Sequence, residues 1–339
     1  MGEFVGRKRD AEVDCFKGIL ILCVLFAHEV SSIRFFYWFH MPLFFAVAGY
    51  YLRETDNFLR WIKEKFVRLA VPYFAHFAAL TLIGLNDEFS KSQVVSLFWG
   101  GRRLTGYVGV WWFPTCFFLS IAGSQIIIKF FNRKIQWLTV TVCFAVSIYE
   151  WKTYFVGRNI GDYTLRMRLP WNIDVALMGI VFIMLTYFGK NLISSIRSMN
   201  TSKKIGASTA AALIILAICV VFSINSQNMD VDMKYSKYGN TILILLFPML
   251  FGIILITISG LLCKIQWTRK LFVFWGRNSL PIMYMHVPLL FHFRKVVADG
   301  STWIQLSIAM ATLLICSVCC WAIEKNKVTR FLFVTGKRS

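Results

Sequence analysis

Lys17 and His28 are ionisable residues in an otherwise apolar stretch, "DCFKGILILCVLFAH", which runs from residue 14 to residue 28. At about 100° per residue the two side chains lie within ~20° of one helix face, about 16 Å apart along the axis. An ionisable group at membrane depth is costly and by default indicates function. Imidazole can act as a general base or as a nucleophile. Lysine can bind phosphate, or extend its ammonium to the membrane surface.

The whole composition indicates a membrane protein around these residues. Of the 339 residues 57% are hydrophobic and only 16% are charged, which is typical of a polytopic membrane protein. The sequence predicts one all-α integral membrane domain over residues 1–339, a bundle of about ten transmembrane helices. The expected spans are 15–33, 36–52, 66–85, 108–130, 135–150, 172–189, 205–224, 240–262, 279–293 and 303–323.

The distribution of positive charge predicts the orientation. Lys and Arg together number 37, against 17 Asp and Glu. With the N-terminus inside, most of these cations fall on the cytoplasmic side, so the positive-inside rule favours both termini in the cytoplasm. This explains the basic balance without nucleic acid as a partner. The segments 86–107 and 151–171 are expected outside, and each contains a pair of arginines, Arg102 with Arg103 and Arg166 with Arg168.

Helix direction allows depth to be compared between spans. The first span ends outside and the second and sixth begin there, so His28, His40 and Asp174 are expected at a similar level. Three further residues are expected at about that depth: Glu29, Trp111 and Trp112. Carboxylates can fix a histidine tautomer and bind sugar hydroxyls, and indoles can stack on sugar faces. The sequence therefore predicts an outer cavity suited to a carbohydrate acceptor.

Each of the polar residues also has a structural interpretation. Asp174 is an orienting partner of His28, an acceptor ligand, or a helix N-cap after Pro170. Glu29 points ~100° away from His28, which favours an interfacial or structural role. His40 either lines the cavity or caps its helix. On the cytoplasmic side, Lys65 and Arg68 suit phosphate binding, although most cations at this level only set topology.

Five segments together resemble the membrane acyltransferase-3 family, in the branch similar to fucose 4-O-acetylases and related sugar O-acetyltransferases. The first is the basic residue followed after ten residues by histidine, with Lys17 where arginine is usual. "FHMPLFFAVAGYYLR" has Ala48 where a serine commonly stands. The other three are "KFVR", "PWNIDVAL" and "WGRNSLPIMYMH", beginning at Lys65, Pro170 and Trp275. The resemblance covers about residues 9 to 325.

The resemblance implies that acetyl-CoA from the cytosol donates an acetyl group to a sugar hydroxyl. His28 is then the catalytic base, or carries the acetyl group itself, with Asp174 as its expected partner. Lys17, Lys65 and Arg68 would bind the CoA phosphates. On the acceptor side we expect four residues, Glu29, His40, Trp111 and Trp112. No metal is expected.

The expected partners are a sugar or glycan acceptor, either free or lipid-linked, and membrane lipids, in the cytoplasmic (inner) membrane of a bacterium. The identity of the acceptor, the acyl group and the oligomeric state stay open. The alternative function is a transporter or flippase of a lipid-linked sugar, in which His28, Asp174 and Lys17 would couple protons or line the substrate pathway. Repeated halves with broken spans, which are frequent in transporters, are not evident in the sequence.

Overall fold

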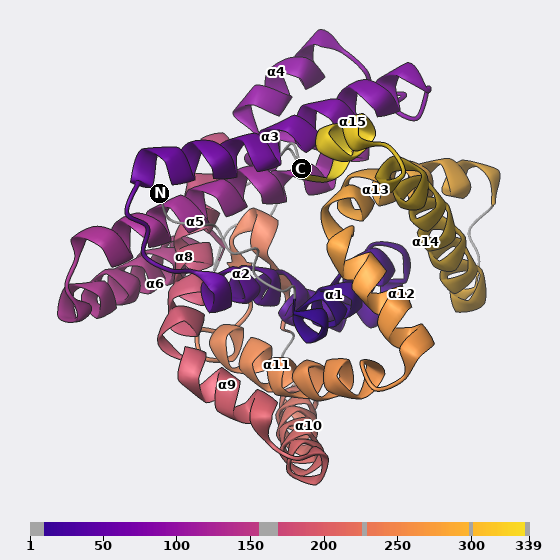
Figure 1. Ribbon diagram of the computed structural model, residues 1–339. Helices are drawn as coiled ribbons and strands as arrows, with labels where there is room; N and C mark the ends of the chain where they lie inside the picture. The colour runs from indigo at the N-terminus through magenta and orange to yellow at the C-terminus, as the bar shows by residue number, and fades with distance from the viewer. Residues whose placement is uncertain (1–9, 156–168, 226–228, 298–300, 336–339) are drawn as a thin grey trace.

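The computed structural model describes residues 10–155, 169–225, 229–297 and 301–335, and most of them are helical (Figure 1). The α-helices are α1 (Ala11–Glu29), α2 (His40–Tyr51), α3 (Phe58–Leu82), α4 (Lys91–Trp99), α5 (Trp112–Phe130), α6 (Arg133–Phe155), α8 (Ile173–Phe188), α9 (Lys190–Ser198), α10 (Thr201–Ile224), α11 (Leu243–Leu262), α12 (Gln266–Arg277), α13 (Ser279–Val296), α14 (Thr302–Glu324) and α15 (Lys327–Arg330). The predicted all-α character is confirmed.

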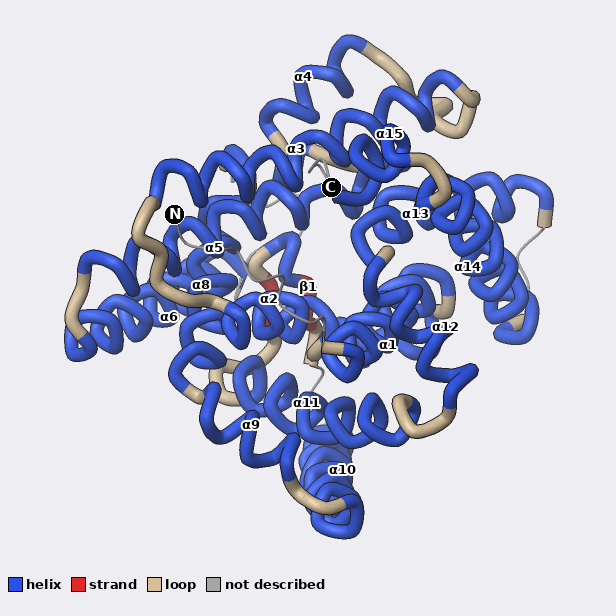
Figure 2. The backbone as a smooth tube through the Cα atoms, in the orientation of Figure 1, coloured by secondary structure: helices blue, strands red, loops and turns tan. Residues whose placement is uncertain are grey.

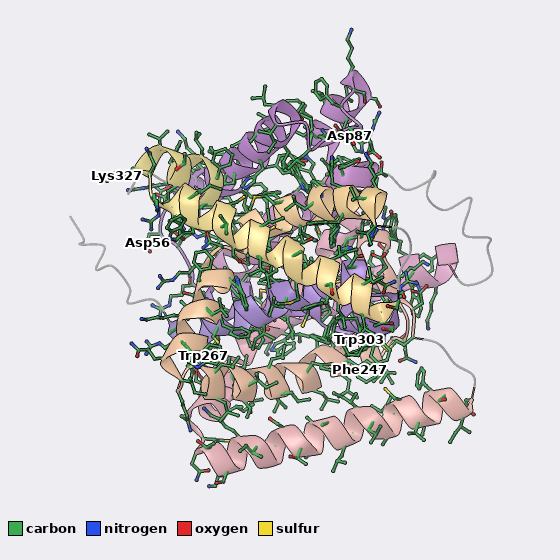
Figure 3. The ribbon with its side chains drawn as sticks, turned by 90° about the vertical axis from the view of Figure 1, so that its right-hand side faces the viewer. Asp56, Asp87, Phe247, Trp267, Trp303 and Lys327 are labelled. Atoms are coloured by element: carbon green, nitrogen blue, oxygen red, sulfur yellow. The ribbon has the colours of Figure 1, made fainter. Side chains whose placement is uncertain are left out.

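Five of the described helical segments are long and apolar enough to cross a membrane. They are Gly106–Phe130, Pro170–Phe188, Thr201–Ile224, Leu243–Leu262 and Thr302–Glu324. The protein is therefore an integral membrane protein, and the number of ten spans stays a prediction. Helix α10 is the most exposed to lipid of these five segments, because only 6% of its apolar window is buried inside the protein. Figure 3 shows it as the pink helix along the lower edge of the bundle.

The predicted topology assigns Asp56, Trp267 and Lys327 to the inner side and Asp87 and Trp303 to the outer side. Figure 3 places the first three at one end of the bundle and the other two at the opposite end. The two groups of residues therefore lie at opposite ends of the bundle, as helices of alternating direction require. Which end faces the cytosol stays a prediction.

Helix α1 lies near the centre of the bundle, where α2, α11, α12, α13 and α14 contact it (Figure 1). Its closest neighbour is α12, and the two backbones touch at glycines. A Cβ at Gly18 would overlap the carbonyl oxygen of Phe272, and one at Gly276 would overlap that of Asp14. Only glycine permits this approach. The contact fixes α1, and with it the position of His28 at the other end of the helix.

The first part of the predicted second span, residues 36–52, does not belong to the α-helix. A 3-10 helix covers Ser31–Trp38, with a non-helical Ile33, and the α-helix begins at His40. The twelve residues of α2 extend only about 18 Å, which is less than the ~30 Å hydrocarbon core. The chain thus turns back over the end of α1 before α2 starts.

Several short elements were not predicted. Helices α9 and α12 are amphipathic segments next to predicted spans, and α4 lies inside the predicted outer segment 86–107. Short 3-10 helices cover Gly101–Arg103, Gly106–Trp111 and Pro170–Asn172. Most of the other predicted outer segment, 151–171, including Arg166 and Arg168, lies outside the described residues.

A small hairpin connects α10 and α11. Strands β1 (Val231–Asp232) and β2 (Lys237–Tyr238) pair antiparallel, joined by a 3-10 turn, Met233–Tyr235. Ser236 adopts a left-handed conformation with a φ of 54°. The hairpin contacts the 3-10 helix before α2 and also α6, and Figure 2 shows it as the red segment near α2, inside the ring of helices.

Candidate active site

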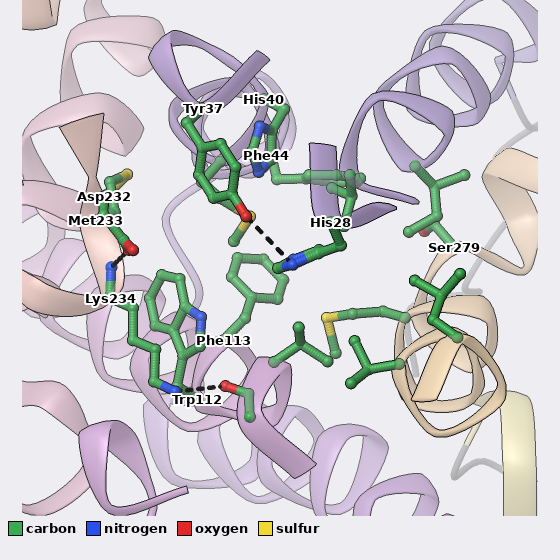
Figure 4. Close-up of a pocket in the computed structure, with 18 of the residues that line it drawn as sticks. His28, Tyr37, His40, Phe44, Trp112, Phe113, Asp232, Met233, Lys234 and Ser279 are labelled. Atoms are coloured by element: carbon green, nitrogen blue, oxygen red, sulfur yellow. Dashed lines mark hydrogen bonds between the residues drawn. The ribbon is translucent and has the colours of Figure 1, made fainter. Parts of the chain in front are cut away.

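A cavity of about 330 Å³ contains His28 (Figure 4). Its walls come from α1, the turn before α2, the start of α5, the hairpin and α13. The polar and aromatic lining residues include His28, Tyr37, His40, Trp112, Lys234 and Arg294. Along α13 the lining extends from Ser279 to Arg294, a rise of about 22 Å. The cavity is therefore elongated parallel to α1 and α13.

His28 lies in the last turn of α1 and faces this cavity. Its Nδ1 is 3.2 Å from the hydroxyl oxygen of Tyr37, and its ring centroid is 5.4 Å from that of His286. If Nδ1–H donates to the tyrosine oxygen, Nε2 keeps its lone pair and can accept a proton. The turn before α2 brings Tyr37 to this place, so that turn sets the orientation of the imidazole. The sequence reasoning did not identify Tyr37.

His40 and Trp112 line the same cavity as His28. The Nδ1 of His40 is 2.5 Å from the carbonyl oxygen of Phe36, to which it donates, and the ring lies edge-on against Tyr37 at 5.1 Å. The Nε2 of His40 is then left as a hydrogen-bond acceptor. Two of the four predicted acceptor-side residues are thus gathered around His28.

Glu29 and Trp111 do not line the cavity in the described part of the chain. Glu29 is buried and forms an ion pair with Arg294 at 2.8 Å. Arg294 also donates to the backbone carbonyl of His28 at 2.6 Å and lines the cavity itself. Glu29 therefore acts on the cavity through Arg294. Trp111 is fully buried, and its indole N–H donates to the carbonyl of Tyr284 at 3.2 Å.

Asp174 is placed away from the lining of the His28 cavity, as far as the described residues show. It forms a buried ion pair with Arg102, and its carboxylate accepts from Ser236 at 3.0 Å. Glu150 lies 3.8 Å from the same guanidinium. The backbone N–H of Arg102 donates to the side chain of Asn172 at 2.7 Å. The structure thus makes Asp174 part of an arginine cluster that supports the hairpin.

The predicted donor-binding cations lie on two helices. Lys17 on α1 pairs with Asp14 at 2.7 Å, and Arg277 lies 3.6 Å from the same carboxylate. Lys65 on α3 lies over the ring of Trp61 at 5.5 Å, and Arg68 is exposed on the same helix. Among the described residues, none of the three predicted cations lines the His28 cavity.

Lys234 is a cationic residue of the cavity that the sequence reasoning missed, as is Arg294. It is only 9% exposed, and its Nζ donates to the carbonyls of Leu104 at 2.6 Å and Gly109 at 2.8 Å. Burial lowers the pKa of Lys234 to about 8; Asp232 opposes this shift and the charge of Arg102 adds to it. In the sequence Lys234 stands in a loop between two predicted spans, where a lysine is normally solvated.

Two comparisons with known proteins each found a match. The family described as an acyltransferase domain matches residues 10–323 of the chain. The nodulation protein NolL of Sinorhizobium fredii (strain NBRC 101917 / NGR234) is 27% identical over 158 residues, covering 41% of this chain and 42% of NolL. The chain therefore matches less than half of that relative's length.

Proposed function

The chain belongs to the acyltransferase domain family that matches residues 10–323, and from this membership we propose that it O-acetylates a sugar with acetyl-CoA as donor. The acceptor is a hydroxyl of a cell-surface sugar or of its precursor. As a family member with membrane-spanning helices the protein is a membrane acyltransferase. The donor, the acetyl group and the sugar acceptor are the proposed part.

The observation that carries this proposal is the place of His28 in an elongated cavity. The cavity follows α13 for about 22 Å from Ser279, at the predicted inner end, to Arg294. That length is comparable to an extended pantetheine arm. A thioester held from the inner side could then reach His28 without passage of the nucleotide through the bundle. The shape of the cavity and the chemistry of its histidine therefore fit one reaction.

His28 acts as the general base in the proposed reaction. Its Nε2 accepts the proton of the acceptor hydroxyl while that oxygen bonds to the acetyl carbon, and it returns the proton to the CoA sulfur as the carbon–sulfur bond breaks. Tyr37 accepts from Nδ1–H and holds the tautomer that leaves Nε2 free. Proton transfer by a positioned side chain typically contributes 10²–10⁴-fold to a rate.

The remaining predicted residues take roles set by their positions. Lys17, Lys65 and Arg68 hold the phosphates of CoA at the inner surface, as compact or forked cations do. His40 and Trp112 bind the acceptor from the cavity wall. These assignments rest on the predicted topology and on the lining of the cavity.

Three further predicted residues act from outside the cavity lining. Glu29 holds Arg294, which lines the cavity. Trp111 is hydrogen-bonded to the backbone carbonyl of Tyr284 on α13 and so helps to hold that helix in place. Asp174 is a positioning residue, which acts on the cavity through Arg102 and the hairpin.

The test uses glycans of cells that carry the gene, so the acceptor need not be known. Mass spectrometry of surface and lipid-extracted glycans should show added acetyl groups with the wild-type gene, and a loss of at least 100-fold with His28→Ala. His292→Ala is the matched control, because His292 lies on α13 outside the cavity lining and bonds to the carbonyl of Pro288. Cells that carry the gene with His292→Ala should show the same acetylation as cells with the wild-type gene.

Purified protein in liposomes with acetyl-labelled CoA separates the enzyme from a transporter. Label that appears on the extracted glycan, and is lost with His28→Ala, supports the proposed function. Movement of an unmodified lipid-linked sugar across the bilayer, without transfer of label, would instead establish the transporter.

A further inference from the structure

The ammonium group of Lys234 lies in the wall of the His28 cavity without a hydrogen-bonded counter-ion. Both of its hydrogen-bond acceptors are neutral backbone carbonyls, of Leu104 and Gly109. An ammonium has three N–H donors, so one is not used by these two carbonyls. Within the described residues, no ion pair within 4.0 Å includes Lys234. A buried charge of this kind is expensive unless it has a partner.

The backbone of Lys234 is held rigidly. Its carbonyl accepts from the Nε of Arg102 at 2.9 Å and from the amide of Asn172 at 3.1 Å. Arg102 in turn donates to Ser236 of the same hairpin at 2.5 Å. Binding sites depend on this kind of fixed geometry, because a group that is already positioned loses little entropy when a ligand arrives.

The charged and titratable groups that face Lys234 do not neutralise it by direct contact. Asp232 uses its carboxylate to accept the backbone N–H of Lys234 at 3.1 Å. The ring of Tyr235 lies 5.3 Å from the ammonium, and Arg102 and His28 are within electrostatic range. Arg294 adds a second cation to the lining of the same cavity.

We propose that Lys234 forms an anion subsite of the cavity, which binds a carboxylate or phosphate group on the acceptor. The acceptor is then an acidic sugar, a refinement that rests on the proposed function. In Figure 4 Lys234 and Ser279 lie on opposite sides of His28, so an acceptor bound at Lys234 leaves the other side to the acyl donor. An ammonium attracts an anionic sugar and has no charge–charge interaction with a neutral one, so selectivity comes from the attraction of the anion.

Direct binding to purified protein tests the subsite without any catalysis. The probes are methyl β-glucoside, methyl β-glucuronide and glucose 1-phosphate, measured by isothermal titration calorimetry at pH 7. At least one acidic probe should bind tenfold or more tightly than the neutral one. The carboxylate and phosphate arms identify which anion the site accepts. If neither acidic probe binds more tightly than the glucoside, the proposal is overturned.

Lys234→Met should reduce the affinity for the preferred acidic probe at least tenfold and leave the glucoside unaffected. Lys237→Met is the matched control, because Lys237 belongs to the same hairpin and pairs with Asp230 at 3.0 Å outside the cavity lining. If Lys234→Met keeps the full preference for the acidic probe, Lys234 only ties the hairpin to the neighbouring loop and the subsite does not exist.

A measurement on the unaltered protein covers the case in which Lys234→Met fails to fold. The preference for the acidic probe should fall as the pH rises from 7 to 9.5, because burial lowers the pKa of Lys234 below its ordinary value and the ammonium loses its charge at a lower pH than an exposed lysine does. Both acidic probes stay charged over this range. A preference that is constant with pH contradicts the subsite. Anion binding without glycan acetylation would reject the proposed function alone, and acetylation without anion preference would reject the subsite alone.

Discussion

Arg102 and Arg197 each pair with two carboxylates, at opposite ends of helix α8. Arg102 binds Asp174, in the first turn of α8, and lies 3.8 Å from Glu150. Arg197, on the helix that follows α8, pairs with Asp10 at 2.8 Å and Glu12 at 2.7 Å. The side chain of Arg102 is 2% exposed and that of Arg197 is 18% exposed.

The two clusters use the same chemistry in different surroundings. Water reaches Arg197 and its partners, so it screens their attraction and would solvate any group left unpaired. Water does not solvate Arg102 and its partners in this way. Loss of one residue of the Arg102 cluster therefore leaves a buried charge without its partner. Arg102 also holds the carbonyl of Lys234 and the hydroxyl of Ser236. The Arg102 cluster therefore shapes the candidate active site, while the Arg197 cluster fastens the start of α1.

The largest effect is expected from Arg102→Met. This change leaves Asp174 and Glu150 buried without their cation, and it should lower the free energy of unfolding by about 3–5 kcal/mol. Denaturant unfolding in detergent micelles, followed by tryptophan fluorescence, measures the loss. The hairpin should also loosen, because the carbonyl of Lys234 loses one of its two side-chain donors.

Arg103→Met is the matched control for Arg102→Met. Arg103 is the next residue, half-buried, and its guanidinium lies over the ring of Trp99 at 5.9 Å. Losing that contact should cost no more than about 1 kcal/mol. Equal losses for the two variants would show that the buried ion pairs of Arg102 do not set the stability of this end of the bundle.

Gly18→Ala tests whether close backbone contact, and not charge, stabilises the packing of α1 against α12. The new Cβ would overlap the carbonyl oxygen of Phe272 on α12, which is backbone and cannot rotate away. Such overpacking typically costs 1–3 kcal/mol, and the same unfolding experiment measures it. Gly206→Ala on α10 is the control, since nothing lies within 4 Å of its Cβ and alanine favours a helix by up to about 1 kcal/mol. If Gly18→Ala leaves the free energy of unfolding unchanged, α12 can move away from α1 to make room for the new Cβ.

Much of the helical framework could be predicted from the sequence, because apolar length and the alternation of direction are one-dimensional properties. The same reasoning placed His28, His40 and Trp112 at one level, and the structure brings them into one cavity. Depth along parallel axes is enough for such a prediction when each residue lies at the end of a helix. It does not tell which way a side chain points, and Glu29 and Trp111 face other partners.

The residues that complete the site could not be predicted in this way. Tyr37 reaches His28 only because the chain turns back in a 3-10 helix, and Lys234 enters the cavity only because a hairpin folds inward. Asp174 pairs with Arg102 from 72 positions away. Two adjacent arginines in a loop indicate an exposed segment, and the carboxylates that permit burial of Arg102 lie on two distant helices. Such contacts depend on tertiary packing alone.

The smallest effect is expected from Arg197→Gln. At neutral pH this partly exposed network should contribute only about 0.5–1 kcal/mol to the free energy of unfolding.

The pH dependence of this contribution shows whether it comes from charge. Burial raises the pKa of Asp10. The hydrogen bond and charge of Arg197, together with the backbone N–H groups of Val13 and Glu12, lower this pKa by more than burial raises it, so the net pKa is below the ordinary 3.8. A depressed carboxyl pKa stabilises the fold above the unfolded value, and this contribution is lost as the pH falls through the folded value. The difference between wild type and Arg197→Gln should therefore shrink as the pH is lowered from about 5 to about 2. A difference that stays constant over that interval would mean that Arg197 stabilises by packing against Tyr50, whose ring lies 5.5 Å from its guanidinium, and not by charge.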